Sequence, residues 1–305
     1  MLVYTIKRLF VALLVVFVVS LLTFTFTNVA VDPALAIAGE GASDADIALI
    51  RQQYGFDRPL HVQYGDWLSG TLTGNFGNSI RQRRPVLEML GERFPITMSL
   101  GAFALTLALV VAVPLGVVAA MNPNTWIDRT ALSIAVLGMA LPTFWFGLIL
   151  IIIFGVTLRW LPISGTATFA HFVLPAITLA YYSIPIIMRL TRAGMIEVLA
   201  SDYIRTARAK GLLPLTVLFK HALRNAIIPV VAIAAVQFGH LLAGSVVVEA
   251  VFALHGVGFL AWESINTADL PVIQAIVLVL SVFYVVLVFL ADVLNAFLDP
   301  RIRIA

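Results

Sequence analysis

Residues with the chemical groups of a catalytic or metal-binding site are few and scattered in this sequence. There is no cysteine, which excludes thiolate metal ligands and thiol nucleophiles. The five histidines lie in separate segments without the spacing of metal ligands, and no lysine lies in the GxxxxGK[ST] pattern that cradles phosphates. Paired carboxylates, a Ser/His/Asp set and an HExxH motif in a defined site are also lacking. The sequence therefore predicts that the chain is not an enzyme and binds no cofactor or metal of its own.

Polar side chains within long apolar runs are the remaining candidates, because ionisable groups are costly in lipid and usually functional there. Gln237, His240 and Glu249 are of this kind, and we expect them to have a gating or pathway role. For Glu249 the alternative is plain surface exposure, and for His240 a packed side chain is a simpler interpretation than a ligand. A relay of buried carboxylates is lacking, which disfavours a proton-coupled transporter.

The elements that carry these residues belong in a membrane. The chain of 305 residues is 61% hydrophobic and 11% charged, too apolar for one water-soluble core, and its net charge of +3 is too small to favour a nucleic-acid partner. A spanning helix needs about 20 apolar residues. Such runs predict an all-α membrane protein with six transmembrane helices, at 9–31, 94–127, 130–158, 172–188, 225–248 and 270–291. The first run resembles a signal peptide, but its length favours an uncleaved helix.

The basic residues indicate the orientation of the spans, since short cytoplasmic loops retain Lys and Arg. Most of them fall on one side of the six-span arrangement, and the last loop on the other side, 251–269, has none. Both termini are therefore predicted to be cytoplasmic. The basic residues on the predicted cytoplasmic side are Lys7, Arg8, Arg129, Arg189, Arg192, Arg205, Arg208, Lys210, Lys220, Arg224, Arg301 and Arg303.

The long segment between the first two spans is expected to form an external subdomain. Ser43 and Asp44 precede a helical pattern that ends at Gly55, and Leu60 opens a second amphipathic stretch that ends among the glycines after Gly70. The predicted organisation is a first transmembrane helix at 1–30, an external subdomain at 31–97 and a five-helix core at 98–305.

The core contains one long cytoplasmic loop, 189–225, with an ordered charge pattern. Acidic residues stand first and basic residues last, as the helix dipole favours. Gly211 suits the left-handed position after a helix, and Pro214 suits the first turn of the next. The loop is thus predicted to form a helix-turn-helix, with a solvated basic loop that only follows the topology rule as the alternative.

The sequence of this loop resembles the coupling loop of binding-protein-dependent ABC importer permeases, in DYIRTARAKG at 202–211 and HALRNAIIPVV at 221–231. Only Ala207, Gly211 and Leu223 fit the general family signature, but TARAKG and HALRNA are the usual forms in the dipeptide, oligopeptide, glutathione and nickel branch. Further matches are VYTIKRL at 3–9, GFDRPLHVQYGDWL at 55–68, GNFGNS at 74–79, VVVEAVFALHGVGFL at 246–260 and LDPRIR at 298–303. VAVDP at 29–33 departs from the common LPGDP, and Asn75 stands where Asp is common.

The resemblance implies a permease subunit in the bacterial inner membrane that forms half of a translocation pathway, most simply for dipeptides or oligopeptides. Glutathione and nickel are alternative cargoes, and an ATP-independent transporter or channel is the alternative of another class. The implied partners are a second homologous permease, two cytoplasmic ATPases that hold ATP and Mg²⁺, and an external solute-binding protein. The residues implied in ATPase coupling are Asp202, Tyr203, Arg205, Thr206, Ala207, Arg208, Ala209, Lys210 and Gly211.

Overall fold

The structure, a computed structural model, describes residues 2–29, 32–39 and 41–298, and most of these residues are helical. Only an isolated bridge between Asn78 and Pro85 is of β type there. The predicted all-α class is therefore confirmed. The LDPRIR motif after its first residue, and the terminal arginines of the topology argument, lie outside the described residues.

Five helices are long and apolar enough to cross a membrane within the described ranges. Each overlaps one of the predicted spans, although the observed helices extend further into the flanking segments. The second of them begins within the range that the sequence assigns to the external subdomain. The five helices are α1 (Leu2–Val29), α5 (Val86–Met121), α8 (Ala170–Leu199), α12 (Ile228–Val251) and α14 (Leu270–Leu298).

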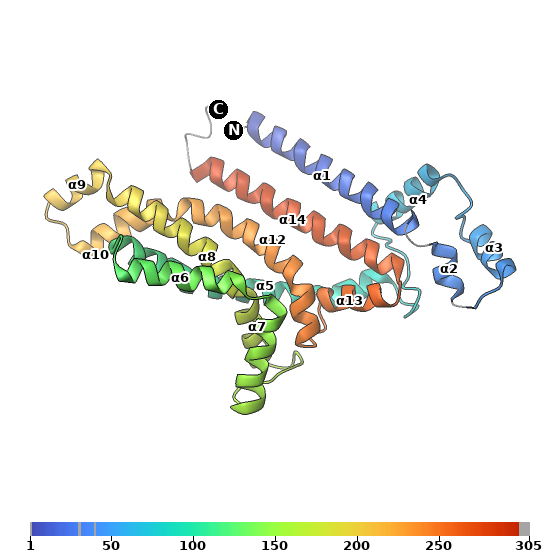
Figure 1. Ribbon diagram of the computed structural model, residues 1–305. Coiled ribbons are helices and arrows are strands. Elements are labelled where there is room, and N and C mark those ends of the chain that lie inside the picture. Colours follow the sequence, from blue (N-terminus) through green and yellow to red (C-terminus); the bar gives the residue numbers. More distant parts are fainter. Residues whose placement is uncertain (1, 30–31, 40, 299–305) are drawn as a thin grey trace.

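The predicted span at 130–158 is not one continuous helix. It is divided into α6 (Trp126–Ala140), α7 (Thr143–Leu150) and a π-helical stretch, η1 (Ile151–Thr157). Leu141 adopts extended backbone angles before Pro142, as steric contact with the proline ring favours. The chain turns sharply at this point, and α7 with η1 projects away from the other helices (Figure 1).

Small residues allow α5 and α8 to pack closely along the centre of the bundle. Ala104, Ala108 and Ala112 on α5 are fully buried, and the main apolar cluster joins them to Leu174 and Ile187 on α8. Small side chains let helix backbones approach in a lipid-facing protein, where dispersion contacts replace the hydrophobic effect. Helices α1 and α14 lie side by side along one flank, and Arg8 is joined to Asp292 at 3.1 Å.

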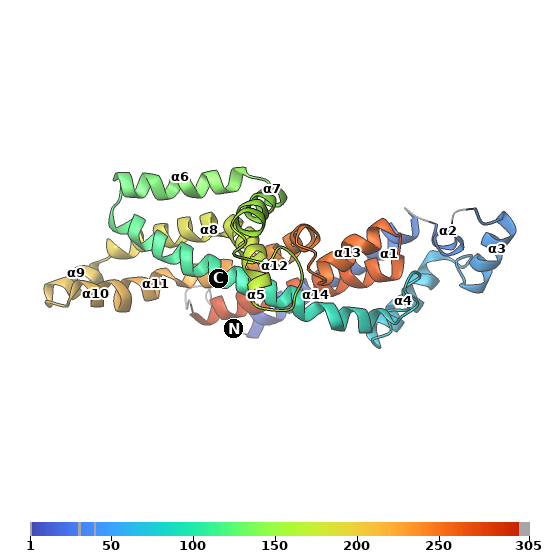
Figure 2. The same cartoon turned by 90° about the horizontal axis from the view of Figure 1, so that it is seen from below.

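The two ends of the bundle carry different structures. One end holds α9 (Asp202–Ala209), α10 (Pro214–Thr216), the π-helical η2 (Val217–Leu223) and α11 (Arg224–Ala226). The other holds α2 (Pro33–Ala38), α3 (Asp44–Gln53), α4 (Leu60–Leu72) and α13 (Val257–Asn266), as Figure 2 shows. Both helices predicted for the segment between the first two spans are present, and Ser43, the predicted start signal of the first, forms a capping box with Asp46.

Candidate functional site

Helix α9 is seated on the bundle by one apolar face. Ile204 is fully buried and Ala207 nearly so, in a cluster that includes Met195 of α8, Val117 of α5 and Ala222 of η2. The acidic residue stands in the first turn of α9 and a basic residue in its last, as predicted from the charge pattern. The buried face of α9 therefore shares one apolar cluster with the ends of two of the long helices.

The opposite face of α9 is polar and open. The side chain of Asp202 is 91% exposed and forms a 3.1 Å ion pair with Arg205, which is 75% exposed. Such a pair contributes little to stability, so its charges are available to a partner. Of the predicted coupling residues only Ala207 is buried. The exposed ones are Asp202, Tyr203, Arg205, Thr206, Arg208, Ala209, Lys210 and Gly211.

A tight turn returns the chain from α9 to the membrane helices. Gly211 has φ +74°, in the left-handed region that the sequence predicts, and its amide donates to the carbonyl of Arg208 at 3.0 Å. Pro214 begins the next helix, also as predicted. Asn225 donates to the hydroxyl of Tyr203 at 2.9 Å, which joins the two arms of the turn. The helix-turn-helix is therefore one structural piece.

A buried ion pair, which no sequence pattern marks, joins α6 to α8 next to the helix-turn-helix. The guanidinium of Arg192 contacts the Asp128 carboxylate through two nitrogens, each at 2.6 Å, and the Asp128 side chain is 3% exposed. The hydrogen bond from Arg192 is the main cause that lowers the pKa of Asp128. The residues are 64 positions apart, so nothing in the local sequence marks them as partners. The pair attaches α6 to α8 at Arg192, which lies ten residues before α9 begins.

Glu249 forms a polar network at the opposite end of α12. Its carboxylate is fully buried, accepts hydrogen bonds from the Thr97 hydroxyl at 2.8 Å and the Phe259 amide at 2.9 Å, and so joins α5 and α12 to the first turn of α13. Thr97 in turn accepts from the Val257 amide at 2.8 Å. A side chain at position 258 would place a Cβ 2.7 Å from the backbone of Val246, so Gly258 allows this close approach. Surface exposure of Glu249 is thereby excluded.

The other two residues predicted in apolar runs lie differently. Gln237 is buried and donates to the Ser183 hydroxyl at 3.1 Å, between α12 and α8. The expectation that His240 is packed inside the chain is wrong, because its side chain is exposed. It shares one face of α12 with the exposed residues Ala243 and Val247, at helical spacing. No other helix in the described part of the chain covers these three side chains.

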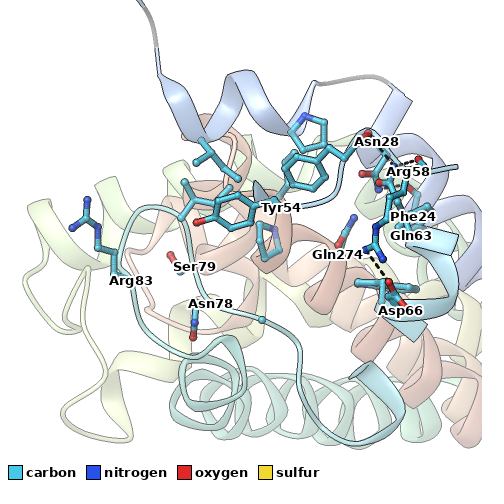
Figure 3. A pocket seen from close by; sticks show the side chains of 18 residues that line it. Phe24, Asn28, Tyr54, Arg58, Gln63, Asp66, Asn78, Ser79, Arg83 and Gln274 are labelled. Atoms are coloured by element: carbon cyan, nitrogen blue, oxygen red, sulfur yellow. Dashed lines mark hydrogen bonds and ion pairs between the residues drawn. The ribbon is translucent and has the colours of Figure 1, made fainter. Parts of the chain in front are cut away.

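The end of the bundle opposite α9, which the sequence predicts to be external, contains a pocket that the sequence did not predict. Its volume is about 690 Å³, and its walls come from α1, α2, the segment between α3 and α4, α4 itself, the loop before α5 and the start of α14. Figure 3 shows Tyr54 in its middle, Arg83 at one edge and the pair Arg58 and Asp66 at the opposite edge. Aromatic and polar side chains therefore share the lining, as is common in small-molecule sites.

Comparison with known proteins adds three findings. Residues 112–304 match the family described as "Binding-protein-dependent transport system inner membrane component", and residues 1–101 match the corresponding N-terminal family. The glutathione transport system permease protein GsiC of Escherichia coli is 42% identical over 304 residues, which are 99% of both chains, and GsiC of Salmonella typhimurium is equally similar. The MetNI methionine ABC transporter in an inward-facing conformation aligns with a TM-score of 0.57 at 19% identity, over 70% of this chain and 97% of that one. The last match shows a likeness of fold alone.

Proposed function

We propose that this chain, which belongs to the family of binding-protein-dependent transport system inner membrane components, is the subunit through which an importer of short peptides couples ATP hydrolysis to opening of its pathway. The chain is a multi-pass inner-membrane permease of the ABC importer type. In this proposal α9 is the surface on which a separate ATP-binding subunit docks.

The two-faced construction of α9 is the observation that carries the proposal. Its charged face is open to a partner, while Ile204 and Ala207 join it to α5 and α8. A displacement of α9 by its partner would therefore be passed to the ends of two long helices. The Asp128–Arg192 pair would extend that displacement to α6, because it links α6 to the same part of α8.

The cargo is proposed from the relatives. GsiC proteins are permeases of glutathione transport systems, and their similarity covers nearly the whole chain. We therefore place glutathione, a tripeptide, first and dipeptides or longer peptides second, which reverses the order that the motifs alone suggested. Nickel comes last, because the similar permeases described above belong to glutathione transport systems.

The proposed assembly contains a second, related permease, two ATP-binding subunits and an external solute-binding protein. The exposed face of α12 with His240, Ala243 and Val247 supports the second permease, because an uncovered polar group on a spanning helix is costly in lipid. This arrangement would place His240 on the pathway between two permeases. The basic residues around α9 support a cytoplasmic position for that end, and with it for both chain termini.

A charge reversal on α9 tests the coupling role. In the reconstituted transporter, Arg205→Glu, Arg208→Glu and Lys210→Glu combined should abolish both uptake and the ATPase stimulation that loaded binding protein causes. The folded state should persist, because all three side chains are exposed. The matched control is Lys220→Glu with Arg224→Glu, in the second arm of the same loop, which should retain most of the uptake. Normal uptake by the triple variant would contradict the proposal.

Ligand identification on the cognate solute-binding protein tests the cargo. Thermal shifts should be measured with reduced glutathione, dialanine, a longer peptide and a nickel chelate. Stabilisation by glutathione above all others is the expected result. Stabilisation by the nickel chelate alone would overturn the cargo assignment and leave the coupling role of α9 intact.

A further inference from the structure

The external pocket has a rigid polar edge, built by the loop from Ser79 to Arg84, which we call the arginine loop. Asp269, which directly precedes α14 and is 3% exposed, accepts hydrogen bonds from this loop. Its carboxylate accepts from the Ser79 hydroxyl and from the Ile80 amide at 3.0 Å. The Ser79 amide donates to the Arg84 carbonyl at 2.9 Å, which closes the loop on itself. A buried carboxylate satisfied by backbone amides fixes the position of the loop.

The arginine loop places a cation without an ion-pair partner in the described part of the chain at the outer edge of the pocket (Figure 3). Arg83 has φ +54°, an unfavourable conformation for a side chain of this kind, and it persists because Asp269 and the loop closure fix its neighbours. Arg84 pairs with Glu92 at 2.6 Å, whereas the guanidinium of Arg83 has no ion-pair partner among the described residues. Arg83 lines the pocket, but Arg81, which is also exposed, does not.

The opposite edge of the pocket carries both signs of charge. Arg58 and Asp66 form a 2.8 Å ion pair, and the Asp66 side chain is 60% exposed, so its carboxylate can accept further hydrogen bonds. Arg83 and this pair lie on opposite sides of Tyr54 (Figure 3). A ligand that spans the pocket would thus meet a cation at one end and an accessible carboxylate at the other.

Between these edges lie amide side chains with unused hydrogen-bonding capacity. Asn28 uses its amide nitrogen on the Phe24 carbonyl, and Gln274 uses its amide nitrogen on the Thr27 hydroxyl, which leaves both side-chain oxygens without a donor among the described residues. The Asn78 side chain has no partner within the same part of the chain. Amide groups of this kind pair well with the N–H and C=O groups of a peptide backbone.

We infer that this pocket is a binding site for a short peptide with a free amino group and a free carboxylate, its amino end toward Asp66 and a carboxylate toward Arg83. The volume of about 690 Å³ lies within the usual range for small-molecule sites. Phe24, Tyr54 and Trp67 supply apolar walls for side chains. The inference deepens the proposed function and rests on it: the permease itself would hold cargo briefly at its external end.

The test uses the assembled permease and ATPase complex in nanodiscs, without the solute-binding protein. Binding is measured by saturation-transfer NMR with four probes: dialanine, N-acetyl-dialanine, dialanine amide and reduced glutathione. Dialanine and glutathione should bind saturably and weakly. Each blocked peptide should bind about threefold to fivefold more weakly than dialanine, as the loss of one partly exposed charge contact predicts.

Two variants assign the ends of the ligand. Asp66→Asn should weaken dialanine binding and make it insensitive to N-acetylation, whereas Arg83→Asn should make it insensitive to amidation. Asparagine tolerates the left-handed backbone at position 83, so the loop is kept. The matched controls are Arg81→Asn, in the same loop, and Asp57→Asn, before α4; neither residue lines the pocket, and both variants should behave like the wild type.

Three results would overturn the inference: no saturable binding without the solute-binding protein, equal binding of free and blocked peptides, or an equal effect of Arg81→Asn and Arg83→Asn. Pocket variants that weaken only the affinity for the solute-binding protein would identify the pocket as a protein contact instead. Uptake by the complete transporter is measured in parallel. Normal peptide uptake with an empty pocket would leave the proposed function standing, while normal uptake by the α9 triple variant would remove the proposed function independently.

Discussion

The two ends of the molecule are attached to the bundle in opposite ways. Helix α9 buries Ile204 and Ala207 in a cluster shared with α5 and α8, as the proposed coupling role requires. Helices α3 and α4 have no buried residue at all. The external segment is held instead by edge contacts, such as the hydrogen bond between Ser20 and Tyr64 and the ring of Phe24 against Tyr64.

This difference separates two mechanical tasks. A surface that transmits displacement must be continuous with what it moves, whereas a surface that receives a soluble partner or cargo benefits from local adjustment. Weakly buried segments open at low free energy, while core elements open only at high free energy. We expect hydrogen exchange to be fast in α3 and slow in α9, despite the exposure of both to water.

The largest expected effect comes from the buried ion pair at the α9 end. Asp128→Ala leaves the Arg192 guanidinium without its partner and should lower the unfolding free energy by about 3 to 4 kcal/mol. The counterpart at the other end is Arg51→Ala, which breaks an exposed pair with Asp32 and should cost about 0.5 kcal/mol or less. Thermal denaturation in detergent measures both. Similar losses would contradict the mechanical contrast between the two ends.

Apolar truncation gives the next effect. Ile204→Ala removes a fully buried side chain from the base of α9 and should cost about 3 kcal/mol, with loss of coupled ATPase activity. Leu49→Ala in α3 removes a side chain that is 64% exposed and should change stability by less than about 0.5 kcal/mol. An unchanged melting temperature for Ile204→Ala would show that α9 is not seated as described.

The Glu249 network gives a smaller and more local effect. Glu249→Ala leaves the Phe259 amide and the Thr97 hydroxyl without their acceptor, and should lower the free energy of unfolding by about 2 kcal/mol. Glu249→Gln keeps an acceptor and should recover much of this loss. Hydrogen exchange in the first turn of α13 is the readout. Equal protection of that turn in the wild type and in Glu249→Ala would exclude a positioning role.

The smallest effect is the pH response of the Asp128–Arg192 pair. The pKa of Asp128 is lowered in the folded chain, chiefly by the hydrogen bond from Arg192, so its stabilisation is complete above the unfolded pKa of about 4. It is lost only as the pH falls through the lower folded pKa. The stability difference between the wild type and Asp128→Asn should therefore be constant from pH 7 to about pH 5. A difference that shrinks between pH 7 and pH 6 would assign the stabilisation to another group.

Local patterns predicted local structure well. The left-handed Gly211, Pro214 at a helix start and the helix that begins after Ser43 follow from rules that act within a few residues. The break at Pro142 was also marked by a proline, but the apolar run around it favoured a continuous span.

Long-range contacts escaped prediction because sequence patterns do not specify partners. Asp128 finds Arg192 64 residues away, and Asp269 holds a loop that lies 190 residues earlier at Ser79. The exposure of His240 has a related cause: composition places it within an apolar run, but only the packing of neighbouring helices decides which face of α12 is covered.

The most direct test of the account is photocrosslinking from α9 in the assembled transporter. A photoreactive residue at Tyr203, which is 45% exposed on that helix, should crosslink to the ATP-binding subunit. The same residue at Tyr54 in the external pocket should not. Crosslinking of position 54 but not position 203 to the ATP-binding subunit would contradict the central claim that α9 is the docking surface for the ATPase.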